Sequence, residues 1–157
     1  MCKIDIYRMD YYVDRDALYT LIDEEVSYAA DEAYDETGSS LYDAIVLTKK
    51  DKRLVDKYID DALSAIVKRM WDICKYKVTT SNNVVNTYLV FDLPDMPTEN
   101  RTLFGAEIGR VISLYAITEI YKSRRPALLA EYQARTAESL EKANLIARMR
   151  TSALNTD

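Results

Sequence analysis

Apolar residues recur at helical spacing in four long stretches of the chain. The first covers about residues 14–34, where Asp14 and Asp16 are able to cap a helix and carboxylates occupy the opposite face. The second begins at Thr48, with Asp51 three residues later in a capping-box spacing, and its stripe continues for roughly six turns to Cys74. The first stripe is formed by Leu18, Leu21, Ile22, Val26, Ala29, Ala30 and Ala33.

The third stretch, Thr98 to Lys122, is the most apolar of the four. Its apolar residues extend well past one stripe, and a helix that is apolar on most of its circumference is normally buried. Gly105 and Gly109 lie four residues apart on one face, which predicts the close approach of another backbone. We therefore expect a central helix, capped by Thr98 and covered by the other elements, with apolar positions Leu103, Phe104, Ala106, Ile108, Val111, Ile112, Leu114, Tyr115, Ile117, Ile120 and Tyr121.

The fourth stretch starts at Pro126, after the sharp break at residues 123–125, because proline suits the first turn of a helix. Its stripe is sparser and the segment is rich in alanine, so we expect a more exposed helix up to residue 147. Its stripe is Leu129, Tyr132, Thr136, Leu140, Ala143, Ile146 and Met149.

The pattern changes between the second and third helices. Residues 76–80 and 84–93 are rich in β-branched and aromatic side chains, and the turn formers of residues 81–83 separate them. This predicts a β-hairpin over 76–93 that Pro94 and Pro97 stop. A lone hairpin is marginal in water, so it has to lie against the helices or join another sheet.

Two further segments complete the outline. Residues 3–13 fit either a short strand or an ordered arm, and residues 36–47 are too apolar for a free linker and fit a loop that packs down around a short helical turn. The sequence thus predicts a mainly α fold, a four-helix bundle-like domain with a β-hairpin inserted between its second and third helices. We expect one domain over 1–157, with an N-terminal arm (1–13), a helical core (14–147) and a C-terminal tail (148–157).

Charge and composition narrow the functions. Residues 1–45 hold 12 acidic and 3 basic side chains, which argues against a grip on nucleic acid there and fits either a solvated surface or one that meets a basic partner. The 13 tyrosines fit a protein interface or a composition bias of the source. No apolar run reaches 18 residues, so no membrane span is expected. The absence of a secretion signal and the two unspaced cysteines, Cys2 and Cys74, fit a reduced intracellular environment.

Candidate chemistry is sparse. The chain has no histidine, which removes Ser-His-Asp and Cys-His catalysis and every histidine metal motif. Asp31 shares a predicted helix face with Asp35, as Glu32 does with Glu36, but no cation-binding loop stands beside them. We therefore predict no catalytic, cofactor or metal site and no enzymatic activity. A magnesium-dependent nuclease, which would need converging carboxylates, is the weaker alternative.

The order of elements resembles that of head–tail connector (adaptor) proteins of tailed bacteriophages. The residues that carry the resemblance are KYKVTTSNNVVNTYLVFDLP and LFGAEIGRVISLYAITEIYKSRRPALLAEY, and it spans most of residues 14–150. The resemblance implies a structural protein of the virion neck, made in the host cytoplasm. It would form a ring, usually of twelve copies, between the portal protein and the tail, around DNA that passes without sequence-specific binding.

The resemblance also suggests roles for individual residues. The last helix and tail would dock on the portal, and the tail, Arg148 to Asp157, would be disordered until it met that partner because few of its residues are apolar. The portal-docking candidates are Arg124, Arg125, Arg148, Arg150 and Leu154. The candidates for contacts between subunits are Tyr76, Val78, Val85 and Tyr88.

Other functions stay open at this point. A tail terminator or another ring protein of the neck fits nearly as well as a connector. A cytoplasmic helical interaction module and a small metal-dependent enzyme belong to other classes. The mass of the assembled species separates the interaction module from a ring protein, and converging carboxylates would identify the enzyme.

Overall fold

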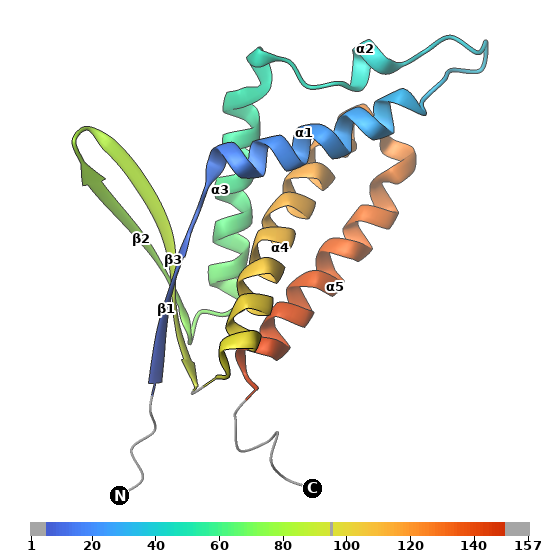
Figure 1. The fold of residues 1–157 in the computed structure, drawn as a ribbon. Coiled ribbons are helices and arrows are strands. Elements are labelled where there is room, and N and C mark those ends of the chain that lie inside the picture. Colours follow the sequence, from blue (N-terminus) through green and yellow to red (C-terminus); the bar gives the residue numbers. More distant parts are fainter. Residues whose placement is uncertain (1–5, 95, 150–157) are drawn as a thin grey trace, which may run out of the picture. The chain divides into compact units, whose positions relative to one another are not determined.

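The computed structural model describes residues 6–94 and 96–149, and this part of the chain is mostly helical with a small three-stranded antiparallel sheet (Figure 1). The predicted helix-rich class is confirmed at that level. The elements, in chain order, are β1 (Ile6–Tyr12), α1 (Arg15–Asp31), α2 (Tyr42–Ile45), the 3-10 helix η1 (Lys49–Asp51), α3 (Lys52–Arg69), β2 (Cys74–Ser81), β3 (Val84–Pro94), α4 (Thr98–Arg124), the 3-10 helix η2 (Pro126–Leu128) and α5 (Leu129–Ala147).

These elements form two compact units. Of the described residues, the first unit takes 6–13, 63–110 and 138–149, and the second takes 14–62 and 111–137. The sheet belongs to the first unit and α1 to the second, whereas α3, α4 and α5 each contribute turns to both. The expectation of a single domain over the whole chain stays a prediction.

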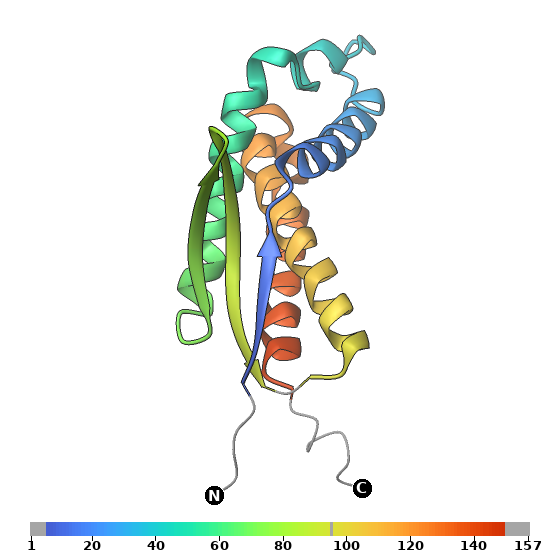
Figure 2. The same ribbon diagram turned by 60° about the vertical axis from the view of Figure 1, so that its left-hand side comes forward.

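The sheet of the first unit has the strand order β1-β3-β2 (Figure 2). Ser81 pairs with Val84 across a two-residue turn, in which Asn82 and Asn83 have φ of 50° and 63°. Two positive φ values are the mark of a type I′ turn, whose twist matches that of the strands, and asparagine tolerates them better than most residues. The predicted hairpin is confirmed, but its strands extend beyond residues 76–93 at both ends.

Within the described part of the ambiguous segment 3–13, residues 6–12 form a strand that pairs antiparallel with residues 88–94 of β3, and residues 3–5 lie outside the described residues. Met9 lies opposite Phe91, and Tyr11 lies opposite Leu89. The hairpin therefore gains a third strand, which is the kind of support that an isolated hairpin needs.

The face of the sheet that carries Phe91 packs on the first half of α4. Phe91 and Phe104 are fully buried, with ring centroids 4.8 Å apart in an edge-to-face arrangement. A Cβ at Gly105 would lie 3.3 Å from the Met9 Cε, and one at Gly109 would lie 3.0 Å from the Tyr11 hydroxyl. The glycines thus make room for side chains of β1, and the expectation that another backbone approaches them is wrong.

The second predicted helix ends earlier than expected. α3 stops at Arg69, Trp71 is 76% exposed, and Cys74 is the first residue of β2. The prediction extended the helix to Cys74 because a buried cysteine fits a helix and a sheet face equally well. In the structure, Cys74 lies opposite Phe91 on the buried face of the sheet. The start was predicted well, since Thr48 and Asp51 form the capping box, although the first turn is the 3-10 helix η1.

The two ends of α4 differ. Its second half is buried on most sides, as a central helix should be, but Leu103 and Ala106 in its first half are exposed. That half is covered on one side only, so the expectation of burial all round is wrong there. The helix also includes Thr98 as its first residue instead of using it as the cap. α5 is largely exposed, as the sparse apolar stripe of this segment predicted.

In the second unit, α1 starts after Asp14, whose side chain accepts the Ala17 N–H at 3.1 Å. In Figure 1 this helix runs crosswise to the turns of α3, α4 and α5 that belong to the same unit. Its predicted stripe is buried except for Leu21, which is 54% exposed on the other face. The connection to α3 packs down as expected, because Ile45 at the end of the short helix α2 is 1% exposed.

Candidate functional site

The hairpin of the first unit carries an exposed apolar surface. Tyr76, Val78 and Val85 are 51%, 48% and 63% exposed. The register places Tyr76 opposite Leu89 and Val78 opposite Thr87, so all three side chains lie on the face that is buried farther along the sheet. We call Tyr76, Val78 and Val85 the hairpin face. It continues the buried face of the sheet, but about half of its surface stays exposed among the described residues.

Tyr88, the fourth residue expected at a subunit contact, lies on the opposite face of the sheet. Its ring centroid is 5.5 Å from that of Tyr12, and the Lys77 Nζ lies 5.7 Å from it. The structure therefore brings three of the four predicted residues together and gives the fourth a packing role beside β1.

Arg124, a predicted docking residue, has its partners inside the second unit. Its guanidinium donates to both carboxylate oxygens of Asp51, at 2.7 Å and 3.2 Å, and to the Ile45 and Val46 carbonyls. The Arg124 bond, together with smaller causes, holds the Asp51 pKa below its usual value. The residue ties the end of α4 to the loop before α3, so a docking role would have to break these bonds.

Arg148 also pairs within the chain. Its two terminal nitrogens donate to the two oxygens of Asp72, both at 2.9 Å, and its Nε donates to Asn144. This ion pair, beside the bidentate pair of Arg69 with Glu141, joins the end of α5 to the end of α3 within the first unit. The expectation that the free tail begins at Arg148 is wrong, and the other tail candidates, Arg150 and Leu154, lie outside the described residues.

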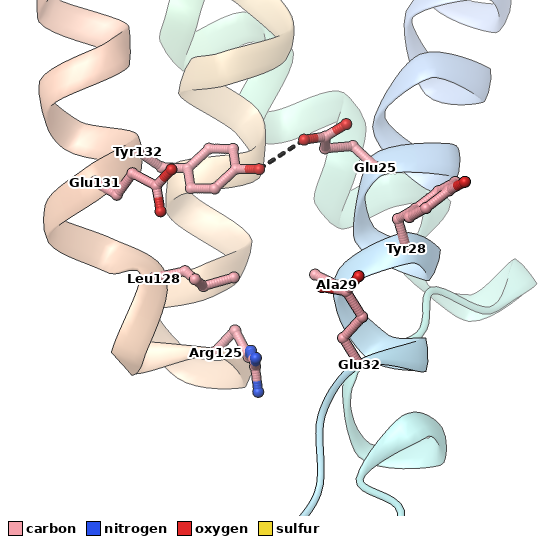
Figure 3. Close-up of a pocket in the computed structure, with 8 residues that line it drawn as sticks. All are labelled: Glu25, Tyr28, Ala29, Glu32, Arg125, Leu128, Glu131 and Tyr132. Atoms are coloured by element: carbon pink, nitrogen blue, oxygen red, sulfur yellow. Dashed lines mark hydrogen bonds between the residues drawn. The ribbon is translucent and has the colours of Figure 1, made fainter.

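Arg125 differs from these two arginines. Among the described residues, its side chain forms no ion pair, and its buried Nε has no hydrogen-bond partner. Arg125 lines a cavity of about 260 Å³ within the second unit (Figure 3). One wall comes from α1 and the other from η2 and the first turn of α5, and the lining residues are Glu25, Tyr28, Ala29, Glu32, Arg125, Leu128, Glu131 and Tyr132.

A hydrogen bond between distant parts of the sequence joins the two walls of this cavity. The Tyr132 hydroxyl donates to Glu25 at 2.6 Å, and the Tyr132 ring stands edge-to-face on that of Tyr121, with centroids 4.8 Å apart. Burial and then the bond to Glu25 raise the Tyr132 pKa to about 12, so the hydroxyl keeps its proton at neutral pH. The Arg135 guanidinium lies 4.9 Å from the ring centroid of Tyr132 and also pairs with Glu131.

The cavity is small, and charged side chains contribute to its lining. It offers one unpaired guanidinium and several carboxylates, and its volume lies below the ~300–1,000 Å³ typical of ligand pockets. Within the described part of the chain, no group of three or more Asp, Glu, Cys or His side chains is arranged to hold a metal ion.

No helix described there is both long and apolar enough to cross a membrane.

Sequence reasoning missed the cavity and the internal ion pairs. Glu25 and Tyr132 are 107 positions apart, and Asp51 and Arg124 are 73 positions apart. A single sequence holds no local signal for such pairs, and only the tertiary fold brings them together.

Comparison of the chain with family models, curated proteins and solved structures finds no match.

Proposed function

We propose that this chain is a head–tail connector of a tailed bacteriophage, a structural subunit that forms a ring between the portal protein and the tail. The ring would surround the DNA channel in the virion neck and would have no catalytic role. The proposal includes a bundle-like packing of the four long helices. Twelve copies is the number that the resemblance to connectors implies.

One observation carries this proposal, which is the hairpin face. A monomer gains nothing from exposing Tyr76, Val78 and Val85 on the side of the sheet that is otherwise core, and exposed apolar surface of this kind marks a protein interface. β2 is also an edge strand, with no partner on its outer side among the described residues. An uncovered edge of this kind invites association with another chain.

The arginines contribute to the proposal in different ways. Arg125 has no side-chain partner among the described residues, so it is the predicted docking residue best placed to meet carboxylates of a portal. Arg124 and Arg148 would contribute to portal docking indirectly, because their ion pairs hold the ends of α4 and α5 in place. Arg150 and Leu154 remain candidates for contacts with the portal.

The test replaces the hairpin face without touching the buried sheet. The variant Val78→Asp/Val85→Asp should keep the melting temperature, because both side chains are exposed, but lose co-sedimentation with portal-bearing phage heads. A matched control, Val84→Asp, changes the neighbouring exposed valine, which lies on the opposite face of the strand. If the double variant binds heads as well as the unchanged chain does, the hairpin face is not an assembly surface.

A further inference from the structure

The outer side of α1 carries a second exposed stripe. Leu21, Glu24, Tyr28 and Asp31 follow one another at spacings of three, four and three, which places them on one line along a helix. All four are exposed, and Leu21 and Tyr28 are 54% and 74% exposed. We call these four residues the outer stripe. It combines two apolar anchors with two carboxylates that form no ion pair among the described residues.

Strand β2 carries positive charge and apolar side chains, which complement the carboxylates and apolar residues of the outer stripe. It has the two exposed lysines Lys75 and Lys77 and no acidic residue, and its other face carries two residues of the hairpin face, Tyr76 and Val78. Lys75 has no ion pair among the described residues, and Lys77 has only a long contact, 3.9 Å, with Asp10. Along the open edge of β2, lysines and apolar side chains therefore alternate.

Charge decides which surfaces of two copies can meet. Two β2 edges side by side would bring lysines together, and two outer stripes would bring carboxylates together, and both arrangements are penalised. The pairing of a β2 edge with an outer stripe matches opposite charges and covers apolar surface on both sides. That contact is heterologous, and heterologous contacts build rings when the rotation closes.

We propose that the outer stripe of α1 in one copy of this chain covers the β2 edge of the next copy. This inference rests on the proposed ring and names its two surfaces. A helix laid along an edge strand is a common way to protect that edge. Leu21 and Tyr28 contact Tyr76 and Val78 of the neighbouring copy, while Glu24 and Asp31 face its lysines.

The test is a charge swap followed by rescue. The variants Lys75→Glu/Lys77→Glu and Glu24→Lys/Asp31→Lys each place like charges in the contact, so each should weaken self-association by about tenfold or more. The variant with all four substitutions restores opposite charges and should regain the assembled mass. The control is Lys49→Glu/Lys50→Glu, which makes the same change of charge at two exposed lysines that belong to neither surface.

Sedimentation velocity and circular dichroism of each full-length variant provide the measurements. The contact is supported if both paired variants lose self-association, the fourfold variant regains it and the control keeps it. If the unchanged chain forms a ring but either paired variant assembles equally well, or the fourfold variant fails to recover while remaining folded, this contact is wrong and the ring proposal survives. A chain that stays monomeric at every concentration, both alone and with a portal ring, overturns both.

Discussion

At the scale of single residues, burial and pairing depend on partners that are distant in the sequence. Leu21 fits the apolar stripe of α1 by spacing, yet it is exposed, and Trp71 follows the spacing of α3 although the helix has already ended. Arg124 reads as a surface charge in the sequence but forms an internal bridge to Asp51. Such assignments require the tertiary fold, because spacing within one element does not say what lies opposite each side chain.

The Arg124 bridge should contribute measurably to stability. Arg124→Ala removes the guanidinium donors from two carbonyls and from the Asp51 carboxylate, which keeps the Thr48 N–H, so we expect a loss of about 1–3 kcal/mol in the free energy of unfolding at pH 7. Arg53→Ala, which removes an exposed arginine from α3, should change it little. Urea unfolding of both variants measures the difference.

The same bridge predicts a dependence on pH. The Asp51 pKa is lowered in the folded chain, with the Arg124 hydrogen bond as the largest cause, so its contribution is present above the unfolded value, 3.8, and is lost as the pH falls through the folded value. Removal of Arg124 should therefore destabilise the chain less in acid than at pH 7. An equal loss at both pH values would mean that the ion pair contributes nothing.

At the scale of elements, the sequence predicts existence and type better than boundaries. The four long helices, the hairpin and the packed loop all occur where periodicity and turn residues indicate them. The pairing of β1 with β3 could not be predicted, because it joins segments about 80 positions apart and residues 3–13 fit a strand or an arm equally well. The burial of α4 on one side of its first half was missed for the same reason.

The contact between β1 and α4 gives a prediction at this scale. Gly109→Ala gains about 1 kcal/mol of helix propensity but places a Cβ 3.0 Å from the Tyr11 hydroxyl, so we expect a net loss of stability. In the background of Tyr11→Phe, which removes the hydroxyl, the same alanine should be neutral or stabilising. A double-mutant cycle measures this coupling, and additive effects would show that the hydroxyl is not what occupies the space at Gly109.

At the scale of the whole molecule, the surfaces carry the functional argument. The four candidate residues for contacts between subunits came from the resemblance to connectors, and three of them, which form the hairpin face, lie together and are exposed. The outer stripe was hidden in the sequence, because Leu21 was counted with the buried residues and the carboxylates beside it resemble any solvated helix face. Exposure separates the outer stripe of α1 from its buried stripe, and its charge is opposite to that of the β2 lysines of a neighbouring copy in the proposed contact.

The central claim is that this chain assembles into a ring, and the mass of the full chain in solution tests it most directly. Native mass spectrometry and sedimentation velocity, over a range of protein concentration and in the presence of a portal ring, should detect one discrete closed oligomer. The mass of this oligomer should correspond to twelve copies of the 18.1 kDa chain. A chain that remains monomeric or dimeric under all these conditions would contradict the account.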